Sequence, residues 1–194
     1  MTRKPVGRLS FENERNDVSH DVIADIDRIL STNHVMEPEL NIGLLLWPEF
    51  PLLALAGLTD TLRHAADIGD NSKKMRCSWN LMSADPARSV CASSGFRIHA
   101  DSTHLPPENF DYIAVIGGLL RSLSQGAAAD RNYLHLAHQK GVPVIGICTG
   151  SFILAEEGLL KGHTAAVHPF HLKDFHARFP AINAVAGKDY IDGG

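Results

Sequence analysis

The stretch GVPVIGICTGSFILAEEGLL, residues 141–160, decides the fold of this 194-residue chain. It begins as a short apolar run, which is typical of a strand buried on both faces, and it continues with helical spacing. Cys148 lies where the two meet, with Gly146 two residues before it and Gly150 two residues after it. The pattern G-x-C-x-G predicts a sharp strand-to-helix turn that holds the cysteine in a strained backbone, as serine is held in G-x-S-x-G turns.

Apolar runs alternate with amphipathic segments on both sides of this turn. Before it, the pattern predicts strands at 41–47, 78–84 and 110–118, a hairpin at 88–101, and helices starting near Pro51 and at Asp130. The apolar face of the first helix comprises Leu52, Leu55, Ala56 and Leu62, and that of the second comprises Tyr133, Leu134 and Ala137. After it, the pattern predicts a short extended piece, a helix closed by Pro180, and strands at 181–187 and 188–194. Apolar strands that alternate with helices predict a three-layer α/β/α sandwich with a mostly parallel sheet.

Composition narrows the class of protein. The chain is 44% hydrophobic, which is enough for one domain core, and its net charge of −4 with scattered basic residues argues against a nucleic-acid-binding surface. The start is polar, and the most apolar region, residues 40–58, is interrupted by Pro48, Glu49 and Pro51, so neither export nor a membrane partner is expected. Three cysteines without CxxC spacing indicate reduced thiols and a cytoplasmic protein.

The two ends of the chain differ from its middle. Residues 1–39 form a polar N-terminal extension, in which residues 18–30 predict an amphipathic arm helix, and residues 40–194 form the globular domain. The final IDGG carries the Asp-Gly signal of a tight hairpin, which calls for a returning strand. Either the chain is a fragment, or its last strand pairs with another molecule. We favour the fragment, so the sandwich is expected to lack its last strand and helix.

Residues 146–170, GICTGSFILAEEGLLKGHTAAVHPF, resemble the class I glutamine amidotransferase-like superfamily, in the branch that holds the PfpI proteases and the Parkinsonism-associated deglycase. The likeness runs from about residue 40 to the end of the sequence. It is nearest to the N-terminal domain of GlxA-type regulators of the AraC family, which is thought to sense a small molecule and precedes two helix-turn-helix motifs. The resemblance implies a flavodoxin-like fold, a homodimer, and DNA contact only through a domain outside this chain.

The resemblance also implies a set of site residues. Cys148 would be the nucleophile or reactive thiol, His168 the family's histidine, and Gly117 and Gly118 its double glycine. The N–H groups of Thr149 and Gly118 would receive an oxyanion or a ligand carboxylate. The predicted ligand-binding set is Glu49, Gly117, Gly118, Cys148, Thr149, Gly150 and His168. Two ordinary alternatives stay open: a capping or core role for His168, and a solvated loop position for Glu49.

Two departures from the family pattern weaken an enzymatic role. Catalytic members carry an acid where this chain has Ala54, and the peptidases carry a histidine directly after the cysteine, where this chain has Thr149. A small-molecule-sensing, dimerising regulator domain is therefore the first hypothesis. A cysteine-dependent hydratase, hydrolase or glyoxalase is the alternative, and a redox or electrophile sensor is a third. No cofactor is expected, and the spacing of His163, His168, His171 and His176 does not suit a metal. On a helix starting near Phe170, His171 and His176 are five residues apart and are expected to be solvated.

Overall fold

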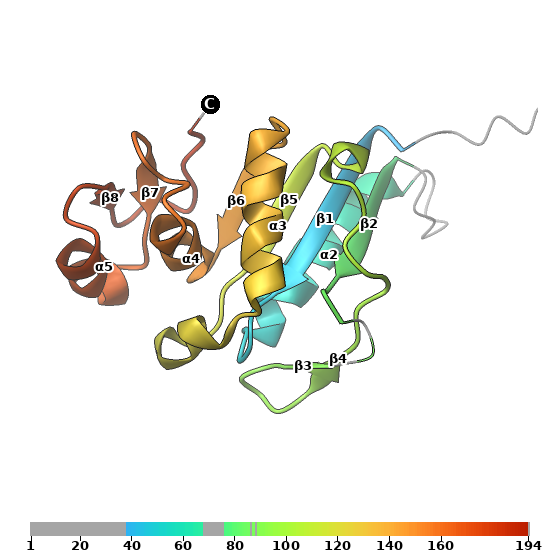
Figure 1. Ribbon diagram of the computed structural model, residues 1–194, viewed down its shortest axis with the longest axis horizontal. Coiled ribbons are helices and arrows are strands. Elements are labelled where there is room, and N and C mark those ends of the chain that lie inside the picture. The colour runs from blue at the N-terminus through green and yellow to red at the C-terminus, as the bar shows by residue number, and fades with distance from the viewer. Residues whose placement is uncertain (1–37, 68–75, 86, 88, 194) are drawn as a thin grey trace, which may run out of the picture. The chain divides into compact units, whose positions relative to one another are not determined.

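A computed structural model describes residues 38–67, 76–85, 87 and 89–193 (Figure 1). The predicted arm helix lies outside these residues, so the division of the chain at residue 39 stays a prediction. The α-helices and strands are β1 (Leu40–Leu46), α2 (Leu52–Ala66), β2 (Cys77–Met82), β3 (Val90–Cys91), β4 (Arg97–Ile98), β5 (Tyr112–Ile116), α3 (Ala128–Gln139), β6 (Val144–Ile147), α4 (Gly150–Glu156), β7 (Thr164–Ala166), α5 (Leu172–Arg178) and β8 (Asn183–Val185). Three 3₁₀ turns join them: η1 (Pro107–Asn109), η2 (Leu120–Gln125) and η3 (Pro169–His171).

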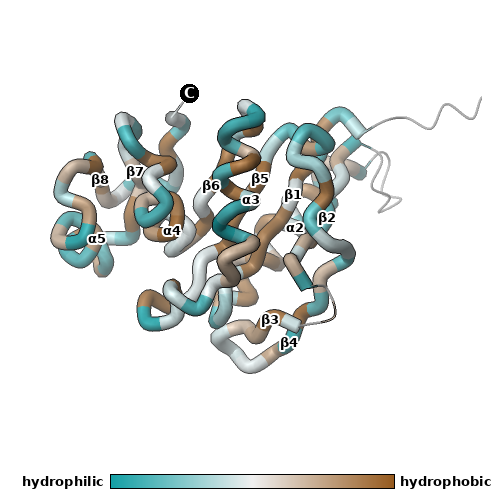
Figure 2. The backbone as a smooth tube through the Cα atoms, in the orientation of Figure 1, coloured by the Kyte–Doolittle hydropathy of each residue, from teal (hydrophilic) through white to brown (hydrophobic). Residues whose placement is uncertain are grey.

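The central sheet has the strand order β2-β1-β5-β6, and every pair in it is parallel. Side chains alternate along β1: Ile42, Leu44 and Leu46 enter a core with α2, whereas Leu45 enters a second core with α3, α4 and α5. Figure 1 shows α2 behind the sheet and α3 in front of it, and Figure 2 shows the hydrophobic colour concentrated on the central strands. The predicted α/β/α sandwich with a mostly parallel sheet is confirmed.

Most of the predicted elements are confirmed, whereas the buried face of α2 and the end of α4 differ from the prediction. In α3 the predicted residues Tyr133, Leu134 and Ala137 are buried, and β3 and β4 form the predicted antiparallel hairpin. In α2 the prediction was partly wrong: Ala56 is exposed, whereas Ala66 is fully buried with Leu62. Helix α4 ends at Glu156 rather than near residue 160, because Gly158 adopts a φ of 71° that a right-handed helix does not allow.

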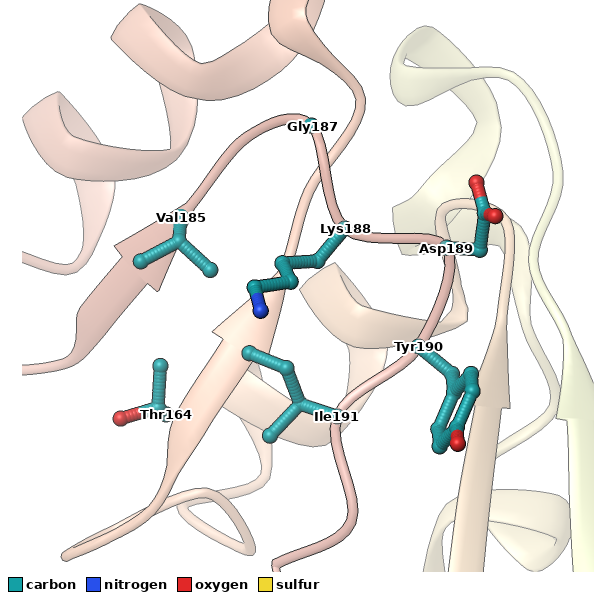
Figure 3. Close-up of a pocket in the computed structure, with 7 residues that line it drawn as sticks. All are labelled: Thr164, Val185, Gly187, Lys188, Asp189, Tyr190 and Ile191. Carbon is teal, nitrogen blue, oxygen red and sulfur yellow. The ribbon is translucent and has the colours of Figure 1, made fainter.

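The predicted strand at residues 188–194 is absent from the described part, which ends at Gly193. Gly187, with a φ of 76°, turns the chain away from β8, which pairs only with β7 among the described strands. Figure 3 shows the segment that follows: the side chains of Lys188 and Ile191 point toward Thr164 and Val185, whereas Asp189 and Tyr190 point away. These residues surround a hollow of about 700 Å³ beside β7 and β8.

A charged network joins α3 to the end of α4. Arg131 pairs with Glu157 and with Glu156, donates a hydrogen bond of 2.7 Å to the Leu123 carbonyl, and lies 5.3 Å from the ring centre of Trp47. Glu157 also accepts a hydrogen bond of 2.8 Å from His135. Burial by itself raises the pKa of Glu157, but the hydrogen bonds from Arg131 and His135 outweigh it, and the net pKa is below the usual 4.5.

This network predicts an acid-sensitive contribution to stability. A carboxyl whose pKa is lowered by folding stabilises the protein above pH 4.5 and loses that contribution as the pH falls through its folded value. We expect Glu157→Gln to lower the free energy of unfolding by about 1–2 kcal/mol at pH 7, and the difference from the wild type to shrink as the pH falls below 4.5. Urea unfolding at several pH values measures this. The control is Glu108→Gln, which removes an exposed pair with Lys140; an equal loss there would contradict the prediction.

Candidate functional site

The carboxyl ends of three parallel strands meet at one edge of the sheet. The register pairs Leu46 of β1 with Ile116 of β5, and Ile116 with Ile147 of β6. The residues that follow these strand ends are therefore neighbours: Trp47, Gly117 and Cys148. Backbone hydrogen bonds of 3.0 Å, from Trp47 to Ile116, and 3.1 Å, from Gly117 to Ile147, hold these segments together. This is the edge at which parallel α/β sheets bind ligands.

Cys148 lies at the turn between β6 and α4, as the sequence predicts. Its φ is 56°, in the left-handed region that costs an L-residue roughly 1–2 kcal/mol, and its side chain is exposed. Cys77 is buried in β2 and Cys91 is half-buried in the hairpin. Among the three cysteines, only Cys148 combines an exposed sulfur with a strained backbone.

Three glycines allow close backbone packing at this edge of the sheet. A Cβ atom on Gly117 would overlap the backbone of Thr149 and Gly150, and one on Gly150 would overlap the carbonyl oxygen of Val115. A Cβ on Gly118 would overlap the carbonyl oxygen of Pro48. The predicted role of these glycines at the turn is thus close backbone packing, and their role in binding a ligand stays a prediction.

Thr149 ties the cysteine turn to the double glycine. Its side chain is buried, and its hydroxyl donates a hydrogen bond to the carbonyl oxygen of Gly118. The hydroxyl of Ser151 donates to the carbonyl oxygen of Cys148 at 3.3 Å. The Thr149 hydroxyl is thus committed to the backbone of Gly118, while the predicted use of the Thr149 and Gly118 N–H groups by a ligand stays untested.

Cys148, Thr149 and His168 border the same groove of about 780 Å³, which is lined by residues of β6, α4, β7 and the segment 187–193. His168 is exposed and caps η3, because its Nδ1 accepts a hydrogen bond of 3.2 Å from the N–H of Phe170. The capping alternative for His168 is therefore confirmed. In that arrangement a neutral ring carries its proton on Nε2.

His171 also borders the groove, and sequence reasoning missed it. The helical spacing predicted a solvated side chain, but His171 is half-buried against Phe152, with ring centres 6.3 Å apart. Its Nδ1 is buried and has no hydrogen-bond partner among the described residues. The only signal in the sequence was its place three residues after His168, which does not distinguish a groove residue from a surface one.

Glu49 lies on the other side of the double glycine and does not line the groove. Its carboxylate accepts hydrogen bonds from the Ser122 hydroxyl and, at 2.8 Å, from Arg121. The hydrogen bond from Ser122 lowers the pKa of Glu49; burial opposes this effect and Arg121 adds to it. The Glu49 side chain is 32% exposed, so it is partly solvated while its carboxylate is bonded to these two partners. The Arg121 side chain is exposed and pairs with Glu49.

The structure thus groups the predicted residues in two places. Cys148, Thr149 and His168 line the groove, whereas Gly117, Gly118 and Gly150 make close backbone contacts and Glu49 is bonded to η2. Ala54 is half-buried on α2 and brings no carboxylate to the site. The described residues contain no cluster of three or more His, Cys, Asp or Glu able to hold a metal, and no described helix has the length and apolarity to cross a bilayer.

Comparisons with known proteins agree with this fold. The DJ-1/PfpI family model matches residues 68–192. The HTH-type transcriptional regulator CdhR of Pseudomonas aeruginosa is 29% identical over 77% of this chain and 43% of its own length. The HTH-type transcriptional regulator GlxA of Rhizobium meliloti is 27% identical over 79% of this chain and 46% of its own length. The chain therefore spans less than half of either regulator.

Two further similarities lie outside this pair of regulators. The isonitrile hydratase of Pseudomonas putida is 26% identical over 78% of this chain and 60% of its own length. Among solved structures, a putative transcriptional regulator from Vibrio parahaemolyticus superposes with a TM-score of 0.63 and 21% identity, over 80% of each chain. This structural similarity supports the fold.

Proposed function

Because this chain belongs to the DJ-1/PfpI family, we propose that it is the small-molecule-sensing, dimerising domain of a GlxA-like transcriptional regulator. The regulators CdhR and GlxA are similar to it over more than three quarters of its length. Contact with DNA is assigned to a helix-turn-helix domain outside these 194 residues, consistent with the net charge of −4. As a regulator of this kind, the protein is expected in the cytoplasm.

The observation that carries this proposal is the environment of Cys148. Its exposed sulfur borders a groove with room for a small molecule, together with His168 and Thr149. Where catalytic relatives have a carboxylate that transfers protons, this chain has Ala54. The residue after Cys148 is Thr149, whose hydroxyl donates a hydrogen bond to the Gly118 carbonyl oxygen. A site with a place for a ligand but without the acid–base group of its catalytic relatives fits binding better than turnover.

Ligand retention tests the proposal. The purified chain is analysed by native mass spectrometry for bound small molecules, and a thermal-shift screen of carboxylic acids and carbonyl compounds follows. We expect wild type and Cys91→Ser to bind the same compound, and Cys148→Ser and His168→Ala to bind it at least about tenfold more weakly, which corresponds to 1.4 kcal/mol. Equal binding by all four proteins would place the ligand elsewhere and refute the proposed site.

Dimerisation is a separate part of the proposal and is measured separately. Analytical ultracentrifugation of the purified chain over a range of concentrations determines whether two copies associate. We expect a reversible dimer, as in regulators that bind paired DNA half-sites. A monomer at all concentrations would remove dimerisation from the proposal without affecting the ligand site.

The second candidate is a cysteine-dependent hydratase, hydrolase or glyoxalase. Its support is the strained, exposed Cys148 together with the similarity to isonitrile hydratase. The test incubates wild type and Cys148→Ala with an alkyl isocyanide. Chromatography then measures how much N-substituted formamide each protein forms. Turnover that disappears in Cys148→Ala would favour this candidate over a sensor, and no turnover by the wild type would argue against it.

A further inference from the structure

Two residues other than glycine have a positive φ in the described part of the chain: Cys148, at 56°, and Glu49, at 58°. Cys148 follows β6 and Glu49 follows β1 after two residues, so they flank the end of β5 on both sides. Residues in this backbone region persist where the surrounding structure forces them, and they cluster at functional sites. The strain at Cys148 belongs to the proposed ligand site, which raises the question of what Glu49 does.

Glu49 occupies the third position of the turn that follows β1, Trp47–Phe50 (the β1 turn). A hydrogen bond of 3.1 Å from the Phe50 N–H to the Trp47 carbonyl oxygen closes this turn. Pro48 is at the second position, and a turn with proline there and a positive φ at the next residue favours glycine or asparagine. Glutamate supplies neither the freedom of glycine nor the local hydrogen bonds of asparagine. A carboxylate is therefore present at this position against the preference of the backbone.

The partners of the Glu49 carboxylate both come from η2. Ser122, which is fully buried, donates its hydroxyl hydrogen bond to one oxygen, and Arg121 donates to the other at 2.8 Å. The double glycine Gly117–Gly118 precedes η2 with only Leu119 between them. Gly118 leaves no room for a Cβ against Pro48 on one side, and its carbonyl receives the Thr149 hydroxyl on the other.

We infer that Glu49 is a positioning residue of the Cys148 site. By fastening η2 to the β1 turn, its carboxylate fixes Gly117 and Gly118 where they pack against the backbone of Thr149, and so it holds the cysteine turn in place. This role goes through Gly118 and Thr149 and needs no contact between Glu49 and a ligand. It rests on the proposed function only in taking Cys148 as the residue whose position matters.

The test distinguishes the effect of the Glu49 hydrogen bonds from the effect of its strained backbone. Glu49→Gly removes the hydrogen bonds and at the same time relieves the left-handed backbone, whereas Glu49→Gln keeps one acceptor oxygen. The matched control is Glu39→Gln, which breaks another carboxylate–arginine pair, with Arg76, at the opposite end of β1. Two readouts apply to all variants: hydrogen exchange of the Gly117 amide, and the pH profile of the reaction of Cys148 with iodoacetamide.

We expect Glu49→Gly to keep its thermal midpoint and yet to exchange the Gly117 amide about tenfold faster, because its hydrogen bond to Ile147 opens locally. In Glu49→Gly, the rate at which Cys148 reacts with iodoacetamide at pH 7 is expected to differ from that of the wild type by about threefold or more. Glu49→Gln should fall between Glu49→Gly and wild type, and Glu39→Gln should match wild type. A Glu49→Gly protein with wild-type exchange and a wild-type profile would overturn the inference.

If Glu49→Gly does not fold, Ser122→Ala carries the same test, since it removes the buried donor and leaves Glu49 in place. Wild-type exchange at Gly117 in Ser122→Ala would then overturn the inference. The outcome is distinct from that of the proposed function. If every variant, including Cys148→Ser, still bound the ligand as the wild type does, the proposed ligand site would be refuted. Faster exchange of the Gly117 amide in Glu49→Gly would still support the positioning role.

Discussion

Cys148 is expected to react with iodoacetamide at least about a hundredfold faster than Cys77 in the folded protein, since a buried thiol reacts only when the structure opens locally and opening by about 3 kcal/mol gives this factor. Cys148 is exposed at the turn after β6, whereas Cys77 is buried in β2, next to the strand at the centre of the sheet. Cys91 is half-buried and its sulfur lies 3.5 Å from the carbonyl oxygen of Ala92, so it should react at an intermediate rate. Timed labelling followed by peptide mass spectrometry gives the three rates.

Two controls complete this experiment. In concentrated guanidinium chloride the three thiols should react at similar rates, because burial no longer separates them. In Cys148→Ser only slow labelling should remain under native conditions. Equal native rates for Cys148 and Cys77 would show that the cysteine turn is closed to solvent, and both the sensing and the enzymatic proposals would fail.

Gly117→Ala is expected to lower the free energy of unfolding by about 3 kcal/mol, because added volume in a tightly packed region forces neighbouring backbone to move. The new Cβ would overlap the backbone atoms of Thr149 and Gly150, which cannot rotate away as a side chain would. The effect should extend to the site, since these two residues begin α4 directly after Cys148. Urea unfolding measures the loss, and the iodoacetamide rate of Cys148 reports the displacement of the turn.

The matched control is Gly57→Ala, the same change on the exposed side of α2, where no atom lies within 4 Å of the added Cβ. Alanine is a better helix former than glycine, so this variant should be more stable by about 0.5–1 kcal/mol. The two substitutions therefore have opposite expected signs. A loss of less than about 1 kcal/mol in Gly117→Ala would show that α4 can shift at little cost, and that the double glycine is not needed for packing.

The cysteine turn was predictable because its signals are local. An apolar run, two flanking glycines and a helical pattern within twenty residues are enough to place Cys148 between β6 and α4. The parallel sheet followed for a similar reason, since each buried strand is one continuous apolar segment. The end of α4 was not predictable from apolar periodicity, because Leu159 and Leu160 continue the pattern beyond Gly158, where the backbone leaves the helix.

The role of Glu49 was not predictable, because its partners are remote in the sequence. Ser122 is 73 residues away, and only the pairing of β1 with β5 brings η2 to the β1 turn. A carboxylate in a Pro-rich loop carries no sign of such a partner, so a solvated side chain was the ordinary expectation. The network of Arg131 with Glu157 and Trp47 has the same origin, since it depends on the packing of α3 against α4 and β1.

Trp47 gives the protein an optical reporter of its own. The indole is fully buried, its N–H donates to the Leu123 carbonyl at 2.8 Å, and its ring leaves no room for a side chain at residue 126. Any movement of η2 therefore changes the surroundings of the chromophore, and its emission wavelength and quantum yield with them. With Trp79 replaced by phenylalanine, the remaining fluorescence would follow events at this edge of the sheet in real time, without an attached dye.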